Sequence, residues 1–257
     1  MNTSKATRFI SVINYKGGTG KTSTVVNLAH GLALQGRKVL VIDLDPQGSA
    51  GYYFGLNPTN TVYNLLIDNI PLRSCITNAR PGIDMICANE RLYPAELSMA
   101  TLKNKERLLS DRLAGLKDYN IVLIDCAPSM NLLNQNALLL ADEVIIPVSM
   151  EYLSLVGVKQ LLNNIKIMNK ILGKETAISK VVPTFFDKRQ AKSKHILESL
   201  TRVFPELVSQ PIHSNIALSE APGHQQTIFE YAPQSKGAQD YLRLTMEVLK
   251  HGQTQTI

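Results

Sequence analysis

Short runs of apolar residues alternate with stretches of helical spacing along the first part of the chain. Four near-continuous apolar runs cover residues 9–13, 38–43, 119–125 and 143–148. Such runs are typical of strands that are buried on both faces, as in a parallel sheet covered by helices. Residues 22–34, after the first run, carry apolar side chains at helical spacing. We therefore predict an α/β fold with a doubly wound parallel sheet.

The length and composition suit one large domain. The chain has 257 residues, of which 44% are hydrophobic and 19% charged, enough for a sizeable core. No repeat, low-complexity tract or flexible linker divides the sequence. We predict a single domain over residues 1–257, and leave the secondary structure of the weakly periodic residues 51–80 open.

The cysteines and the two ends of the chain favour a cytoplasmic protein. Cys75, Cys87 and Cys126 are odd in number and widely spaced, which indicates reduced thiols instead of a disulfide framework or a zinc site. No apolar run approaches the roughly 20 residues of a membrane helix, and no cleavable signal fits ahead of residue 9. Residues 250–257 lack the apolar face of a membrane-binding helix, so we expect no membrane partner.

A glycine-rich turn follows the first predicted strand. Its sequence, Lys-Gly-Gly-Thr-Gly-Lys-Thr at 16–22, places three glycines between a strand and a helix. Glycines adopt positive φ readily, so successive N–H groups can point at phosphate, and the helix N-terminus adds its dipole. Lys21 would reach the β- and γ-phosphates, and the Thr22 hydroxyl would bind Mg²⁺. We predict a nucleotide site; the alternative is a loop with two solvated lysines.

Three aspartates follow two of the apolar runs. Asp43 and Asp45 belong to the segment Asp-Leu-Asp-Pro-Gln-Gly, and Asp125 ends the run at 121–125. Ligands of parallel α/β sheets bind at the carboxyl ends of the strands, which places all three near the glycine-rich turn. We predict that Asp43 and Asp125 support Mg²⁺ and that Asp45 orients the attacking water in phosphoryl transfer. The alternative, solvated strand ends, is the usual explanation of a single such aspartate.

Taken together, these motifs resemble those of a known family. The turn at 16–22 resembles the deviant Walker A box of the ParA/MinD ATPases. Asp-Leu-Asp-Pro-Gln-Gly, Asp-Cys-Ala-Pro-Ser at 125–129 and Ser-Glu-Ala-Pro-Gly-His at 219–224 are similar to the ParA/Soj branch. The resemblance covers nearly the whole chain. It implies a P-loop NTPase fold with a mostly parallel twisted sheet flanked by helices, ATP and Mg²⁺ as cofactors, and an ATP-dependent sandwich dimer.

The resemblance also implies roles for individual residues. Lys16 matches the signature lysine that reaches across the dimer to the other nucleotide, and Glu151 matches a glutamate that contacts that nucleotide. Pro211 matches the segment that lines the adenine pocket. The predicted catalytic residues are Lys16, Lys21 and Asp45. The predicted nucleotide-binding residues are Lys16, Gly17, Gly18, Thr19, Gly20, Lys21, Thr22, Ser23, Glu151 and Pro211, and the predicted metal ligands are Thr22, Asp43 and Asp125.

Positive charge is concentrated in one part of the chain. The formal net charge is +6, and residues 159–194 hold nine basic residues against two acidic ones. An amphipathic helix is predicted over 157–172, and the basic run at 186–195 opens another. Clustered basic residues without interleaved aromatics suit a DNA backbone read without sequence preference; the alternative is an ordinary solvated surface. The predicted DNA contacts are Lys159, Lys166, Lys170, Lys188, Arg189, Lys192 and Lys194.

One departure from the family pattern bears on DNA binding. Ala217 stands where the family often has arginine, so the lysines of 159–194 would compensate. Too few residues precede Phe9 for a helix-turn-helix domain, which argues against operator binding. We predict a slow ATPase that a ParB-like protein or a cargo adaptor stimulates, and that segregates plasmid or chromosome DNA or positions a protein cargo on the nucleoid. The alternatives are a P-loop metabolic ligase or reductase, and an ATP-locked DNA-binding switch without turnover.

Overall fold

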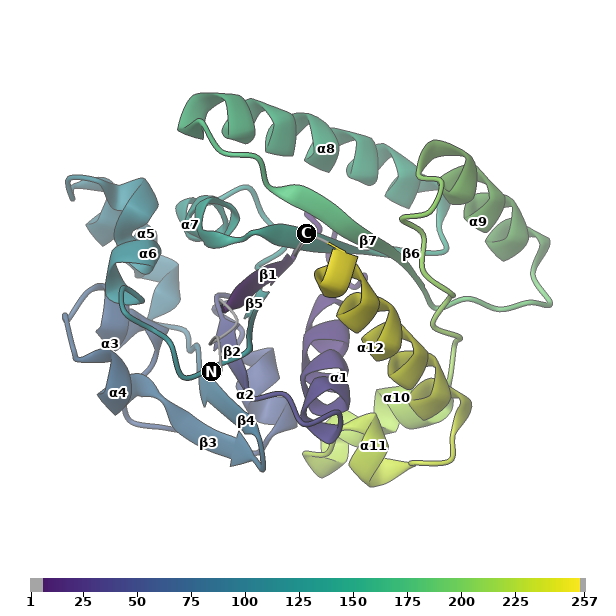
Figure 1. Cartoon of the computed structure of the whole chain (residues 1–257), viewed down its shortest axis with the longest axis horizontal. Helices are drawn as coiled ribbons and strands as arrows, with labels where there is room; N and C mark the ends of the chain where they lie inside the picture. The colour runs from purple at the N-terminus through teal and green to yellow at the C-terminus, as the bar shows by residue number, and fades with distance from the viewer. Residues whose placement is uncertain (1–6, 255–257) are drawn as a thin grey trace.

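A seven-stranded sheet forms the centre of the structure, a computed structural model that describes residues 7–254 (Figure 1). The strand order is β3-β4-β2-β5-β1-β6-β7, and among these strands only β3 runs antiparallel to its neighbour. The predicted doubly wound, mostly parallel sheet is confirmed. The strands are β1 (Arg8–Val12), β2 (Val39–Asp43), β3 (Thr77–Arg80), β4 (Ile83–Ile86), β5 (Ile121–Asp125), β6 (Glu143–Ser149) and β7 (Ala177–Thr184).

Helices cover both faces of the sheet (Figure 1). One face is covered by α1 (Lys21–Leu34), α2 (Ser49–Tyr53), α10 (Ile216–Glu220), α11 (Ile228–Tyr231) and α12 (Lys236–Thr254). The other face is covered by α3 (Val62–Leu66), α4 (Leu72–Cys75), α5 (Leu92–Ala100), α6 (Leu108–Arg112), α7 (Leu132–Leu140), α8 (Tyr152–Leu172) and α9 (Ala191–Val203). Two 3₁₀ turns, η1 (Lys105–Arg107) and η2 (Ala221–His224), complete the chain path.

The apolar runs become strands because both of their faces are buried. In β2, Leu40 and Ile42 belong to the core on one side of the sheet, whereas Val39 and Val41 belong to the core on the other side. Successive side chains of a strand point to opposite faces, so a continuous apolar run fills two cores at once. Every residue of β2, β5 and β6 is buried.

The structure adds to the sequence prediction in one region and corrects it in another. Residues 51–80 contain most of α2, then α3, α4 and β3, elements of four or five residues that are too short to show a period in the sequence. Helix α8 begins at Tyr152 and not at the predicted residue 157. Its first turns carry Leu153 and Val156, which are 75% and 55% exposed and therefore fall outside the buried stripe that marked the helix. Within 7–254, no helix is long and apolar enough to cross a bilayer.

Candidate functional site

The glycine-rich loop connects β1 to α1 at the carboxyl edge of the sheet. Gly18 and Gly20 have φ of 67° and 82°, in the left-handed region that glycine adopts without strain. A Cβ on Gly17 or Gly18 would meet no atom within 4 Å, so this side of the loop faces open space. Helix α1 begins directly after Gly20, and the first N–H groups of a helix have no partner inside it. Loop and helix therefore form a cradle for an anion.

Lys21 lies inside this cradle. Its ammonium donates a hydrogen bond to the backbone carbonyl of Lys16 at 3.2 Å, and only 7% of the residue is exposed. Burial lowers the pKa of Lys21, while Asp125 and Asp45 act in the opposite direction. A phosphate that enters the cradle would replace the carbonyl as the partner of a buried positive charge.

Lys16 lies at the rim of the loop and pairs with Glu151 of the same chain. Its ammonium forms an ion pair with the Glu151 carboxylate and donates to Ser154 Oγ at 3.3 Å. The hydrogen bond from Lys16 lowers the pKa of Glu151, whose side chain is 58% exposed. Two residues that the resemblance places at a dimer contact thus touch each other within one chain.

The predicted acidic residues gather where β2 and β5 end. Asp43 and Asp125 are register partners on these adjacent strands, and both are fully buried. The Asp43 carboxylate accepts the backbone N–H groups of Asp45 and Ala50 at 2.9 and 3.2 Å. Asp45 is partly exposed, and its carboxylate accepts the N–H of Gln47 at 3.0 Å. Asp43 therefore shapes the loop that presents Asp45, a role that its prediction as a metal ligand did not include.

Asp125 has the environment of a cation ligand. Both of its carboxylate oxygens are buried and have no hydrogen-bond partner in the described part of the chain. Burial raises the pKa of Asp125 to about 7, although the nearby Thr22 hydroxyl and Lys21 ammonium lower it. A buried carboxylate is costly to charge unless a cation offsets it.

Thr22 and Asp125 fit a Mg²⁺ ion that arrives with a nucleotide. Among residues 7–254, no group of three or more His, Cys, Asp or Glu side chains could hold a metal by itself. Mg²⁺ commonly takes one or two protein ligands and completes its shell with phosphate oxygens and water. Such an ion would neutralise phosphate charge during transfer of the γ-phosphoryl group.

A pocket of about 420 Å³ extends from the loop toward α12. Its apolar walls come from stretches far apart in the sequence, and include Tyr53, Phe185, Ile212, Leu218, Pro222 and Tyr241. At the loop end, the hydroxyls of Ser23 and Tyr53 form a hydrogen bond of 2.8 Å. Pro211, the predicted adenine contact, is not in the lining, whereas the residues directly after it are. The volume and apolar character suit the base and ribose of a nucleotide.

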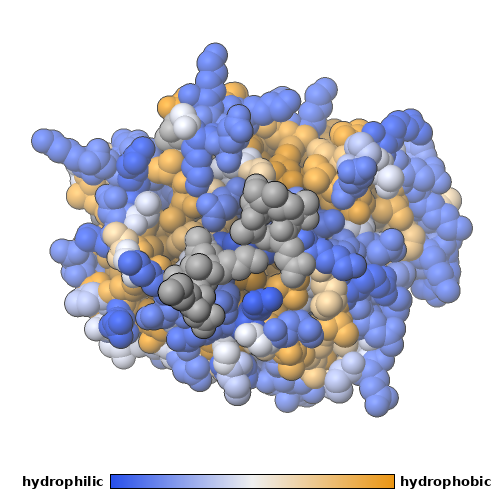
Figure 2. Space-filling model, in the orientation of Figure 1, coloured by the Kyte–Doolittle hydropathy of each residue, from blue (hydrophilic) through white to orange (hydrophobic). Residues whose placement is uncertain are grey.

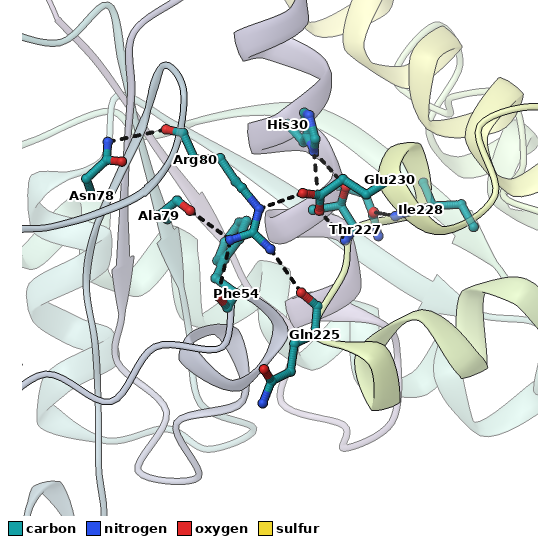
Figure 3. Close-up of polar contacts among 10 residues, drawn as sticks. His30, Phe54, Asn78, Ala79, Arg80, Gln225, Thr227, Ile228 and Glu230 are labelled. Carbon is teal, nitrogen blue, oxygen red and sulfur yellow. Dashed lines mark hydrogen bonds and ion pairs between the residues drawn. The ribbon is translucent and has the colours of Figure 1, made fainter.

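The wall that carries Pro222 is anchored by a polar cluster around Arg80 (Figure 3). The Arg80 guanidinium binds the Glu230 carboxylate at 2.5 Å and the backbone carbonyls of Gln225 and Phe54 at 2.9 and 3.2 Å. On the other side of Glu230, His30 Nδ1 lies 2.6 Å from the Thr227 hydroxyl. The cluster ties residues 225–230 to α1 and to the end of β3, and it thereby fixes one side of the pocket.

Comparison with known proteins agrees with this geometry. The family model of the AAA domain matches residues 7–178. The chain is 37% identical to the sporulation initiation inhibitor protein Soj of Bacillus subtilis, over 95% of this chain and 99% of that protein. It is 36% identical to the chromosome partitioning protein ParA of Myxococcus xanthus, over 95% and 88% of the two chains. The chain belongs to the ParA/Soj family of P-loop ATPases.

A solved structure shows how far the fold of this ParA/Soj-family chain is shared. Cobyrinic acid a,c-diamide synthase from Mycobacterium smegmatis, with bound ADP and magnesium, superposes with a TM-score of 0.85 at 30% identity, over 97% of each chain. A protein with this fold therefore holds a nucleotide and magnesium. The same fold carries different activities, so the assignment of activity to the ParA/Soj-family chain rests on its own site.

The seven predicted DNA contacts of this family member are all exposed, yet they do not form one patch. The ring of His195, next to Lys194 in α9, lies 6.2 Å from the ring of Tyr152 at the start of α8. Lys166 and Lys170 lie nearer the other end of this helix, about 21 and about 27 Å further along its axis at 1.5 Å per residue. In the upper part of Figure 2, along the edge where α8 runs in Figure 1, hydrophilic and apolar side chains lie next to one another.

Other basic residues of the same stretch serve the fold. Lys174 donates to the backbone carbonyls of Leu139 and Ala141, both at 2.6 Å, and Lys180 pairs with Glu247 at 3.4 Å. The charge count of residues 159–194 therefore overstates the charge available to a partner. Arg189 is exposed but binds Asp187 through two hydrogen bonds of 3.0 and 2.8 Å.

The cysteine next to Asp125 is a core residue. Cys126 is fully buried, and its thiol pKa is raised, first by burial and then by Asp125. A neutral, enclosed thiol does not offer the exposed thiolate that an iron–sulfur cluster between subunits requires. This environment argues against the reductase alternative.

Proposed function

We propose that the chain is a partition or positioning ATPase that hydrolyses ATP with Mg²⁺ and binds DNA without sequence preference in its ATP-bound dimer. It acts in the cytoplasm, on the nucleoid. A ParB-like protein or a cargo adaptor stimulates its hydrolysis and releases it from DNA. The observation that carries the proposal is that the loop has two lysines in different places. Lys16 lies at the rim of the loop, whereas Lys21 is buried in the cradle.

The proposed roles follow the positions of the side chains. Lys21 binds the β- and γ-phosphates from within the loop, and Asp45, partly exposed beyond the end of β2, orients the attacking water. Lys16 exchanges Glu151 for the nucleotide of a second subunit, which couples dimerisation to ATP. Because this exchange breaks an exposed ion pair worth little in water, it is easily reversed. Slow turnover follows if the water is placed well only when a partner protein is bound.

The proposed DNA surface comprises the residues nearest the loop, namely Lys188, Arg189, Lys192 and Lys194. Lys192 is close enough to Glu151 to help lower the pKa of that carboxyl. A surface next to the dimer contact would double in size when two subunits meet, which makes DNA affinity depend on ATP. Electrostatic binding to the phosphate backbone releases counterions and weakens steeply with salt.

Charge reversal tests this surface. We expect the triple variant K188E/R189E/K192E to lose DNA retention at low salt and to keep ATP binding, because none of the three residues lines the cradle or the pocket. The matched control is K103E/R107E/K117E, which changes the net charge equally at exposed residues of the α5–α6 region. Filter binding to a long duplex measures both variants. Unchanged DNA affinity in the first variant, or an equal loss in the control, would contradict the proposal.

A metabolic ligase is the alternative raised by the shared fold, and it is not favoured. Relatives that match over nearly the whole chain are named Soj and ParA. A ligase also needs a second substrate beside the nucleotide. Hydrolysis of ATP that requires no organic co-substrate, and that DNA with an adaptor accelerates, would separate the two functions.

A further inference from the structure

Phe185 has an unusual backbone for a large aromatic residue. Its φ is 56°, and the other non-glycine residues with positive φ in the described range are Asn69, Asn104, Glu206 and Gln225. The left-handed region costs a residue with a Cβ about 1–2 kcal/mol, and a bulky residue found there is an outlier. The strain is not repaid by burial in the core, because Phe185 is 51% exposed.

Both neighbours of Phe185 are fixed. The Thr184 hydroxyl donates to the backbone carbonyl of Thr19 in the phosphate loop at 2.9 Å, and this contact is buried. The Phe186 N–H donates to the Ile212 carbonyl at 3.1 Å, and the Phe186 carbonyl accepts the Ser214 N–H at 2.9 Å. Strained backbone persists where the surrounding structure over-determines it. Residue 185 is held between the phosphate loop and the 212–214 segment, two walls of the nucleotide pocket.

This backbone directs the ring to the mouth of the pocket. Phe185 lines the pocket together with Ile212, Ile216 and Tyr241. Its Cε2 and Cζ atoms lie 3.7 and 3.8 Å from the position that a Cβ on Gly20 would take, so the ring rests beside the last glycine of the phosphate loop. A half-exposed aromatic face at this junction has the cradle on one side and the apolar pocket on the other.

We propose that Phe185 is a nucleoside-binding residue, which packs on the base or ribose of the bound nucleotide and leaves the phosphates to the loop. The inference rests on the proposed ATP binding and deepens it. Its physical basis is that stacking between a base and an aromatic side chain is sequence-tolerant and worth several-fold to a hundred-fold in affinity. The left-handed backbone at residue 185 is then explained by ligand binding, since it holds the half-exposed ring at the mouth of the pocket beside Gly20.

Three variants separate the ring from the backbone. Phe185→Asn removes the ring and tolerates the left-handed conformation, Phe185→Tyr keeps an aromatic ring, and Leu97→Asn alters a residue of α5 that is 77% exposed. The affinities of ATP, ADP and inorganic tripolyphosphate for the full chain are measured by calorimetry, and thermal denaturation checks that each variant folds.

We expect Phe185→Asn to weaken ATP and ADP alike by about tenfold, within the range for base–aromatic stacking, and to leave tripolyphosphate within about twofold. Phe185→Tyr and Leu97→Asn should bind all three ligands as the wild type does. Equal affinities of Phe185→Asn and wild type for ATP would overturn the inference alone. An equal loss of affinity for tripolyphosphate would also overturn it, because it would assign Phe185 to the phosphate loop. A loss of affinity for ATP without a loss for ADP would overturn it too, because it would assign Phe185 to the subunit contact. A wild-type chain that binds no ATP would overturn the proposed function together with this inference.

Discussion

The two ends of the nucleotide site are built in different ways. The phosphate end is assembled from three compact motifs, each at or shortly after the carboxyl end of a strand, at 16–22, 43–45 and 125. The nucleoside end is assembled from single residues of widely separated stretches, among them Tyr53, Phe185 and Tyr241. The phosphate end holds Lys21, Asp43 and Asp125 in buried positions at the edge of the sheet. The nucleoside end depends on loops that are tied down by contacts such as those of Arg80.

In this fold, the chemical step and the nucleotide affinity therefore depend on different ends of the site. Substitution of Asp45 at the phosphate end should change the chemical step with little effect on folding, because its side chain is partly exposed. Substitutions at the nucleoside end should change stability and nucleotide affinity together, because the same contacts hold the loops and form the pocket. Three variants test this contrast.

The largest effect is expected at Asp45. Asp45→Ala should lower ATP hydrolysis by at least about 100-fold, the range for loss of a group that positions or activates the nucleophile, while ATP affinity is retained. It should therefore accumulate as a DNA-bound dimer. Asp45→Asn keeps the acceptor for the Gln47 N–H and controls for the turn. Single-turnover hydrolysis and DNA co-sedimentation report both properties, and normal hydrolysis by the alanine variant would refute the assignment of Asp45.

An intermediate effect is expected at Arg80. Arg80→Ala should reduce the free energy of unfolding by about 2 kcal/mol, since the four hydrogen bonds of its guanidinium are lost, one of them to the Glu230 carboxylate in a pair that is about a quarter exposed. The Michaelis constant for ATP should rise because Pro222 and its neighbours lose their anchor. Arg91→Ala is the matched control, because Arg91 also pairs with an acid and stacks over a ring, but at the surface; its cost should stay near 0.5 kcal/mol. Equal losses of stability and of ATP affinity in the two variants would show that Arg80 has no special part in holding the pocket.

The smallest effect is expected from the titration of His30. Burial lowers the pKa of His30, although Glu230 opposes this and Arg80 adds to it. A folded-state pKa below the ordinary value of about 6.5 contributes stability that is present above that value and is lost as pH falls through the folded pKa. Wild-type stability should therefore decline on acidification below about pH 6.5.

The matching variant removes this part of the pH dependence. His30→Gln keeps a polar group beside Thr227 but does not titrate, so its stability should vary less with pH in the same window. Urea titrations at a series of pH values measure the difference. The pKa of Glu230 is also lowered, by the Thr227 N–H and by Arg80, although burial raises it. Protonation of Glu230 should therefore reduce the free energy of unfolding further, at more acidic pH. Parallel curves for the wild type and His30→Gln would show that His30 does not contribute.

Sequence and structure agree most closely where a motif is contiguous. The strand, loop and helix around residues 16–22 were predictable because the apolar run, the glycines and the helical period are adjacent in the chain. The nucleoside pocket was not, because Tyr53 lies in a five-residue helix and Tyr241 in the buried face of α12, where both look like ordinary core residues. Pro211 marked the correct segment, yet the lining begins one residue later. A tertiary contact, such as that of Phe185 with the phosphate loop, leaves no local pattern in the sequence.

The basic residues of 159–194 show the same limit, because their number in the sequence does not reveal which of them are accessible. A count of lysines and arginines does not distinguish Lys188, which is exposed, from Lys174, whose ammonium is bonded to two backbone carbonyls. Nor does it show that Lys192 lies near the loop while Lys170 lies at the far end of a 21-residue helix. Packing decides which charges are available to a partner.

Co-sedimentation of the purified chain with DNA in ATP–Mg²⁺, in ADP–Mg²⁺ and without nucleotide, over a series of salt concentrations, tests the proposed ATP-gated DNA binding most directly. We expect binding only with ATP, with an affinity that falls steeply as salt rises because the contacts are made to phosphates. Equal binding in all three conditions, or no binding in any of them, would contradict an ATP-gated DNA-binding ATPase.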